Sequence, residues 1–301
     1  MKCCINPIIH VLTALLCTGA AGVGTAGGDT LVLPRKNKEA PAIQHYDIVA
    51  FKAEDKKLVA ERLEHLFLVW ELLATEFWAE SLKEERTEPI PTRHKVVLYR
   101  NKREYADHLR RIDPFIDRSN GFYDASGRTA YFFSPETRVL FHEGTHQILA
   151  EHYFRNKAPA FHNNFWITEG IALFMQTLKV EEKCYKIGDI LDDRLFSAKV
   201  RLFGQNYNLP IRKLTAMTAK EIQSSADIDK IYSQSAALVH WLMFAEEGRY
   251  RRSLFELLRR TYLDTAKPDS LSKLTGLSYE ELDVNYAEFL KTIPDERENK
   301  D

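Results

Sequence analysis

The amino-acid sequence predicts a mixed α+β fold: a small N-terminal sheet lobe with an edge hairpin, a central helix pair, and a mostly helical C-terminal lobe. Three observations predict it. Short runs rich in β-branched and aromatic residues are concentrated in the first half of the chain. A glycine-containing turn joins two of these runs. Beyond Ser134 the apolar residues recur at helical spacing as far as Ile293.

In the N-terminal lobe, strands are expected to alternate with helices. Residues 46–51 and 95–99 are short apolar runs of the kind that form strands. Leucine and valine recur every three or four residues over 54–80, which predicts a long amphipathic helix between the two strands. A charged helix follows the second strand. Two aromatic-rich runs then flank a turn at 124–127, so we expect a hairpin from 121 to 133.

The start of the chain has the pattern of a secretory signal peptide. Met1-Lys2 supplies a positive charge, an apolar run extends from Ile5 to Leu16, and small residues follow. We expect cleavage after Ala20 or Ala26, which would make the protein secreted or periplasmic. A lipoprotein anchor would use Cys17, but Leu16 stands where such a signal needs a small residue.

The whole chain of 301 residues has an ordinary globular composition, with 45% hydrophobic and 28% charged residues. The net charge of −1 gives no indication of a nucleic-acid partner, and no later apolar run approaches the length of about 20 residues that a membrane span needs. The oligomeric state is not indicated. We divide the chain into a signal peptide (1–26), a linker (27–42), an α/β lobe that carries the candidate site (43–180), a helical lobe (181–293) and a charged tail (294–301).

A candidate metal site lies on the helix that follows the hairpin. A hydroxyl, a proline and an acid in Ser134-Pro135-Glu136 predict where this helix starts. His142 and His146 are four residues apart, slightly more than one turn, so both imidazoles should project from one face and hold one ion. Zinc binds imidazole nitrogens at about 2.0–2.1 Å. The carboxylate of Glu143 would reach water on the metal and act as general base.

Two residues compete for the position of third ligand. His152 lies six residues after His146, a spacing that the metzincin class uses with a glycine midway. Here that midway residue is Leu149, so the helix should continue and turn His152 away from the metal. Glu169 lies 23 residues after His146, at the start of a second apolar helix. Two antiparallel helices joined by a loop of about ten residues would bring Glu169 back over the histidines. We therefore predict one zinc ion bound by both motif histidines and Glu169.

Glycine stands inside both predicted helices, where it costs about 1 kcal/mol relative to alanine. Gly144 is thus expected at a point where another group comes close to the backbone. Gly170 is expected to let the second helix pack closely on the first.

The segments His142-Glu143-Gly144-Thr145-His146 and Trp166-Ile167-Thr168-Glu169-Gly170-Ile171-Ala172 resemble the gluzincin zinc peptidases. The likeness is greatest to their peptidase-MA-like branch, which includes uncharacterised secreted bacterial proteins of similar size, and it is sharp over about residues 130–180. It implies a zincin helix pair with His142, His146 and Glu169 as ligands and Glu143 as catalytic base. It also implies a tyrosine in a later helix as donor to the oxyanion, for which Tyr232 is the candidate. The sequence departs from the thermolysin pattern at Leu173, where that pattern has an aspartate.

These features predict a secreted zinc endopeptidase that acts on a peptide or protein substrate. The edge strand of the hairpin would pair with an extended peptide. The chain lacks the Gly-x-Met-Glu-Asn segment of the related aminopeptidases, which argues against that activity. Two alternatives stay open: a metallohydrolase of non-peptide amides or esters, and a binding protein that keeps the zinc helices as a scaffold. Glu143 argues against the scaffold, because metal binding alone does not need it.

Overall fold

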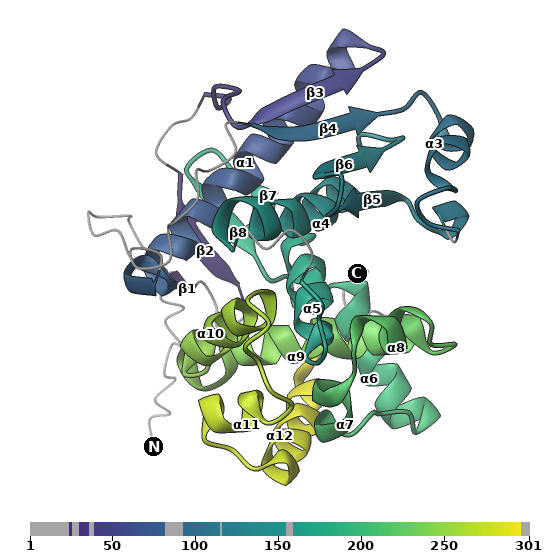
Figure 1. Cartoon of the computed structure of the whole chain (residues 1–301). Coiled ribbons are helices and arrows are strands. Elements are labelled where there is room, and N and C mark those ends of the chain that lie inside the picture. The colour runs from purple at the N-terminus through teal and green to yellow at the C-terminus, as the bar shows by residue number, and fades with distance from the viewer. Residues whose placement is uncertain are drawn as a thin grey trace, which may run out of the picture.

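The computed structural model of the chain describes residues 24–25, 30–35, 39–81, 93–114, 116–154 and 159–295. It confirms the mixed α+β fold, with small sheets in the N-terminal part and a helical C-terminal part (Figure 1). No helix among the described residues combines the length and apolar character needed to cross a membrane. Except for Gly24 and Thr25, the predicted signal peptide lies outside the described residues, as does the predicted tail beyond Asp295.

The main sheet has four strands. Their spatial order is β3 (Tyr46–Ala50), β4 (His94–Leu98), β6 (Thr129–Phe132) and β5 (Gly121–Asp124). The first three run parallel to one another, whereas β5 pairs antiparallel with β6, as the hairpin pattern predicted. β5 is therefore an edge strand of this sheet.

Helices cover both faces of the main sheet. On one face, α1 (Ala53–Phe77) and α4 (Thr137–Ile148) pack side by side, α1 near β3 and α4 near β5 (Figure 1). On the other face, α3 (Lys102–Leu109) and a 3₁₀ turn at Ile116–Arg118 enclose a small separate core against β5 and β6. The long helix α1 presents buried residues at three- and four-residue spacing, as its periodicity predicted: these include Val59, Leu63, Leu66, Phe67, Trp70 and Leu73.

A second sheet combines segments from the predicted linker and from both sides of the predicted division after residue 180. It has the strand order β1 (Gly24–Thr25), β2 (Leu31–Pro34), β8 (Cys184–Ile187) and β7 (Lys179–Val180). Leu31 and Leu33 of β2 are fully buried, so the predicted linker contains a core strand. The predicted division after residue 180 falls inside the β7–β8 hairpin. The alternating Leu-Val-Leu of β2 is a strand pattern, but the glycines, proline and lysines around it dominate the composition of that segment.

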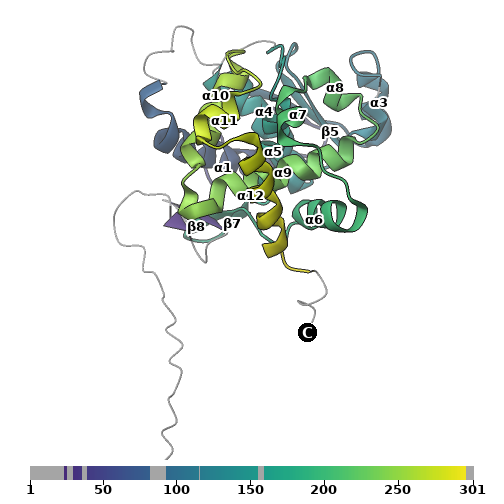
Figure 2. The same ribbon diagram turned by 90° about the horizontal axis from the view of Figure 1, so that it is seen from below.

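The C-terminal part is built around α5 (Phe165–Met175), every residue of which is buried. Its main partner is the long helix α9 (Ile228–Gly248). The surrounding helices are α6 (Asp193–Gln205), α7 (Ile211–Ala216), α8 (Ala219–Gln223), α10 (Arg251–Tyr262), α11 (Ser270–Thr275) and α12 (Tyr279–Thr292). Seen from below, α12 lies across α9 with α6 beside it (Figure 2). In Figure 1, α5 stands between the sheet lobe and these helices.

Candidate metal centre

The helix α4, which carries both motif histidines, begins at Thr137 with Glu136 as its N-terminal cap residue. The expected capping by a hydroxyl of Ser134 is wrong, because the helix starts three residues later and no side chain caps it. Other contacts fix this end of the helix instead. Arg62 of α1 donates a hydrogen bond to the carbonyl of Pro135. Arg138, in the first turn of α4, donates to Asp192 at 2.7 Å.

The side of α4 that faces α1 explains the glycine within the motif. A Cβ on Gly144 would lie 2.8 Å from Leu66 and 2.9 Å from Leu63, both fully buried on α1. On the same side, Trp70 of α1 donates to the hydroxyl of Thr145 at 3.4 Å. The close approach expected at Gly144 is therefore made by a packed helix. It gives no independent support for a ligand at that point.

A second side of α4, continued by the π-helical turn Leu149–Tyr153, faces the main sheet through three polar side chains at four-residue spacing, each with a partner there. These are Glu143 with the backbone N–H of Tyr123 (3.0 Å), Gln147 with the carbonyl of Lys95 (3.0 Å) and Glu151 with the imidazole of His94 (2.8 Å). The Glu151–His94 pair is almost completely buried. Sequence reasoning missed Gln147 and Glu151, although a polar residue at every fourth position of an apolar helix was a usable signal.

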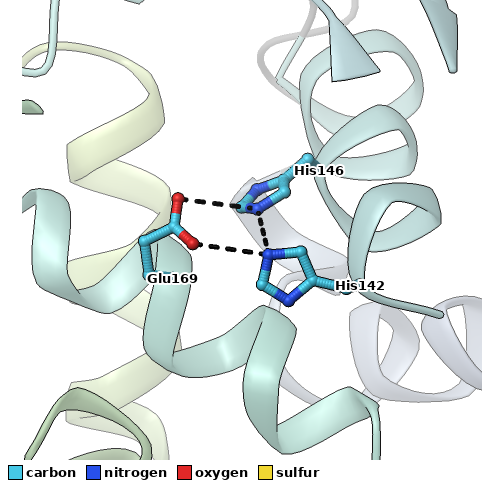
Figure 3. Close-up of side chains that lie close together, drawn as sticks. All are labelled: His142, His146 and Glu169. Atoms are coloured by element: carbon cyan, nitrogen blue, oxygen red, sulfur yellow. Dashed lines mark hydrogen bonds and ion pairs between the residues drawn. The ribbon is translucent and has the colours of Figure 1, made fainter. Parts of the chain in front are cut away.

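The third side of α4 carries the candidate ligands. His142 and His146 face Glu169 of α5 across a short gap (Figure 3). The two Nε2 atoms lie 3.3 Å apart, and the carboxylate oxygens lie 3.4 Å from Nε2 of His142 and 3.7 Å from Nε2 of His146. Tetrahedral coordination at about 2.0–2.1 Å places neighbouring ligand atoms about 3.3–3.4 Å apart. This group of donors could hold a metal ion.

Glu169 owes its position to α9 as well as to α4. A Cβ on Gly170 would lie 2.7 Å from the carbonyl oxygen of Ser235 and 2.7 Å from Val239, both on α9. The expectation that Gly170 seats α5 on α4 is therefore wrong, and it seats α5 on α9. At the start of α5, Asn164 adopts a left-handed backbone conformation (φ 55°), and its side chain donates to the carbonyl of Lys267 at 2.9 Å.

Residues 137–264 match a family model described as "Protein of unknown function (DUF1570)". The chain is thus similar to this family from the first residue of α4 to just past the end of α10. The comparison with curated proteins gave no match. All candidate ligands, Glu143 and Tyr232 fall within the DUF1570 match.

Burial is the largest single influence on the pKa values of the residues in the candidate centre. The side chains of His142, His146 and Glu169 are 13%, 16% and 8% exposed, so only a small part of each is in contact with solvent. Burial lowers the pKa of His146 to about 4. Burial also opposes ionisation of Glu169, but the two imidazoles and Tyr232 outweigh it and hold the pKa of this carboxyl below its usual value. Burial raises the pKa of Glu143, against the opposing effects of His142 and the Tyr123 N–H.

Tyr232 of α9 lies at the same centre. Its hydroxyl interacts with the carboxylate of Glu169, and burial and that carboxylate raise the pKa of Tyr232 well above its usual value. Within the described part of the chain, Nδ1 of His142 is buried and has no hydrogen-bond partner. Among the described residues none therefore orients this imidazole through Nδ1, and the position at which the thermolysin pattern has an aspartate is Leu173.

The rival ligand His152 lies in a π-helical turn, Leu149–Tyr153, that continues from α4. Its ring contacts Phe67 of α1, with 4.8 Å between ring centroids, and lies 6.1 Å from the ring of His94. His152 is not part of the metal-binding group found among the described residues. The wider π turn keeps the chain helical beyond Leu149 and directs this side chain toward α1.

Proposed function

We propose that the protein is a gluzincin-type zinc endopeptidase. The single observation that carries the proposal is the convergence of two imidazole nitrogens and one carboxylate at the spacing of a tetrahedral zinc site, beside Glu143. Two histidines and one glutamate leave one coordination position open, which is characteristic of catalytic zinc and not of structural zinc.

The donors fit zinc in type as well as in spacing. Imidazole nitrogen and carboxylate oxygen are both ordinary zinc ligands, whereas magnesium and calcium prefer sites made of oxygen alone. When bound, zinc would supply Lewis acidity toward a substrate carbonyl and make water easier to deprotonate. His142, His146 and Glu169 would hold the ion.

The residues around the ligands have separate roles in this proposal. Glu143 accepts a proton from the attacking water and passes it to the leaving amine. The Tyr123 N–H, at 3.0 Å, fixes one oxygen of this carboxylate and so limits how the base can rotate. Tyr232, whose hydroxyl interacts with Glu169, is the candidate donor to the oxyanion.

The edge strand favours a peptide over other amides or esters as substrate. β5 is at the edge of the main sheet, next to α4, and its Tyr123 contacts the candidate base directly. An extended peptide that adds to an exposed strand gains backbone hydrogen bonds along its length. A peptide paired with β5 would therefore run past Glu143.

The test is metal analysis combined with hydrolysis of an unstructured protein such as casein. We expect wild-type protein to bind one zinc per chain and to cleave casein, and Glu143→Gln to bind zinc without cleaving it. Glu169→Ala should lose the ion, whereas His152→Ala should keep it. Equal hydrolysis by wild type and Glu143→Gln would refute the catalytic role, and zinc-bound but inactive wild type would favour a scaffold or a non-peptide substrate.

We also infer that the predicted signal peptide directs export of the protein. The first residue of the exported protein should then be 21 or 27, which N-terminal sequencing of the protein from the periplasm or medium would establish. An intact residue 1 in exported protein would contradict cleavage.

A further inference from the structure

We propose that Arg194 is a substrate-binding residue that selects peptides carrying a carboxylate close to the scissile bond. The inference rests on the proposed peptidase function and adds a substrate class to it. Arg194 lies in the first turn of α6, and its side chain is 34% exposed. A planar guanidinium binds carboxylates through paired hydrogen bonds.

One set of contacts ties Arg194 to the helix of the histidines. Asp192 caps α6 by accepting from the backbone N–H of Arg194 at 2.9 Å. The other oxygen of Asp192 accepts from Arg138 at 2.7 Å, and the side chain of Asp192 is only 4% exposed. Arg138 precedes His142 by four residues and so shares its side of α4. The backbone of Arg194 is therefore tied, through Asp192 and Arg138, to α4 one turn before the first candidate ligand.

A second contact ties its guanidinium to the helix of Tyr232. Nη1 of Arg194 lies 3.9 Å from Asp229, which precedes Tyr232 by three residues on α9. Residues at this spacing share one side of a helix. The guanidinium therefore lies beside the side of α9 that carries Tyr232.

The guanidinium remains available to a ligand. Its pair with Asp229 is long at 3.9 Å, and Asp229 is 80% exposed, so solvent screens their attraction. Arg138 differs, because a buried carboxylate neutralises it at 2.7 Å. With a divalent ion in place, Glu143 and Glu169 would balance its two charges. An anionic group would then compete with Asp229 for the guanidinium of Arg194.

Peptide binding to the zinc-loaded Glu143→Gln variant tests the inference without hydrolysis. The probes are fluorescent peptides of one sequence with amidated C-termini, in which a glutamine is replaced by glutamate at one position at a time. A further probe keeps the glutamine and has a free C-terminal carboxylate. Fluorescence anisotropy gives each Kd. We expect one acidic probe to bind about tenfold more tightly than its glutamine counterpart, a modest value because the site is partly exposed. The probe that gains shows whether a side-chain or a C-terminal carboxylate is bound.

Variants of the pair decide whether Arg194 is responsible. In the same background, Arg194→Gln should abolish the tenfold preference and Arg194→Lys should retain part of it. Asp229→Asn should increase the preference, because it removes the competing carboxylate. Arg252→Gln is the matched control: it removes an equal charge from another exposed 3.9 Å pair, with Glu76, and should change nothing.

Three results would overturn the inference: equal binding of all probes, a preference that survives Arg194→Gln, or equal losses in Arg194→Gln and Arg252→Gln. Failure of the proposed function would be recognised separately, as absence of zinc or as equal casein hydrolysis by wild type and Glu143→Gln.

Discussion

The packing of α5 on α9 predicts that the smallest possible enlargement at Gly170 will damage both the fold and the metal centre. In Gly170→Ala the new methyl group would lie 2.7 Å from the backbone carbonyl oxygen of Ser235 and 2.7 Å from Val239. A backbone atom cannot rotate away, so the two helices must separate. Overpacking of this kind costs about 1–3 kcal/mol, and alanine returns about 1 kcal/mol of helix propensity. We expect a net loss of about 0–2 kcal/mol in the free energy of unfolding, near the upper end because the contact involves backbone.

The same substitution elsewhere provides the control. In α6, a Cβ at Gly204 would meet only Val200, at an ordinary 3.8 Å. Gly204→Ala should therefore stabilise the protein by about 0.5–1 kcal/mol. Urea denaturation of the metal-free proteins measures both changes, and competition with a chelator measures zinc affinity. Because Gly170 adjoins Glu169, we expect zinc affinity to fall about tenfold in Gly170→Ala and to be unchanged in Gly204→Ala. Stabilisation of Gly170→Ala to the level of Gly204→Ala would refute the packing argument.

Two further predictions concern buried charge. His240 packs against Phe174, Phe244 and Phe289, and burial lowers the pKa of its imidazole to about 3. In the unfolded chain this imidazole takes up a proton near pH 6.5, whereas in the native chain it does not. The protein therefore loses stability as the pH falls from about 6.5 toward 3. His240→Phe should remove this part of the pH dependence, so that between about pH 6.5 and about pH 4.5 wild type loses about 2 kcal/mol more than the variant in urea titrations; parallel pH profiles would contradict it. The second prediction concerns Glu151→Ala, which leaves the buried imidazole of His94 and the amide of Gln147 without their carboxylate partner. It should cost about 3 kcal/mol of stability, and the zinc content should stay at the wild-type level because Glu151 faces the sheet. Loss of zinc by folded protein would show that the sheet-facing side also shapes the metal centre.

The sequence was sufficient for features that depend on local periodicity. The long helix over 54–80, the hairpin at 121–133 and the helix of the motif all follow from spacing within one segment, and each exists within a few residues of its predicted limits. The convergence of Glu169 on the histidines also followed, because two adjacent helices joined by a short loop have few ways to pack.

Features that depend on distant partners were not predictable in the same way. Strand β2 is defined by its pairing with β8, about 150 residues later, and the residues around it have the composition of a linker. Each glycine signalled a close approach correctly, but a single sequence does not say which element approaches. Gly144 meets α1, for which no partner was named, and Gly170 meets α9 and not the expected α4. Arg194 is one of many arginines until the fold places it between Asp192 and Asp229.

The arrangement of partners around α4 has a consequence for how the two lobes are joined. The α1 and sheet-facing sides of this helix fix it within the N-terminal lobe, through Gly144 and through the polar contacts of Glu143 and Gln147. Glu169 is positioned by the seating of α5 on α9 in the C-terminal part as well as by the packing of α5 on α4. Donors fixed by two different lobes meet at one point, so an ion bound there would connect the lobes as well as serve chemistry. We therefore expect zinc to raise the midpoint of thermal unfolding equally in wild type and in Glu143→Gln, because the ligands alone would carry this connection. A smaller rise in Glu143→Gln would show that the base contributes to it.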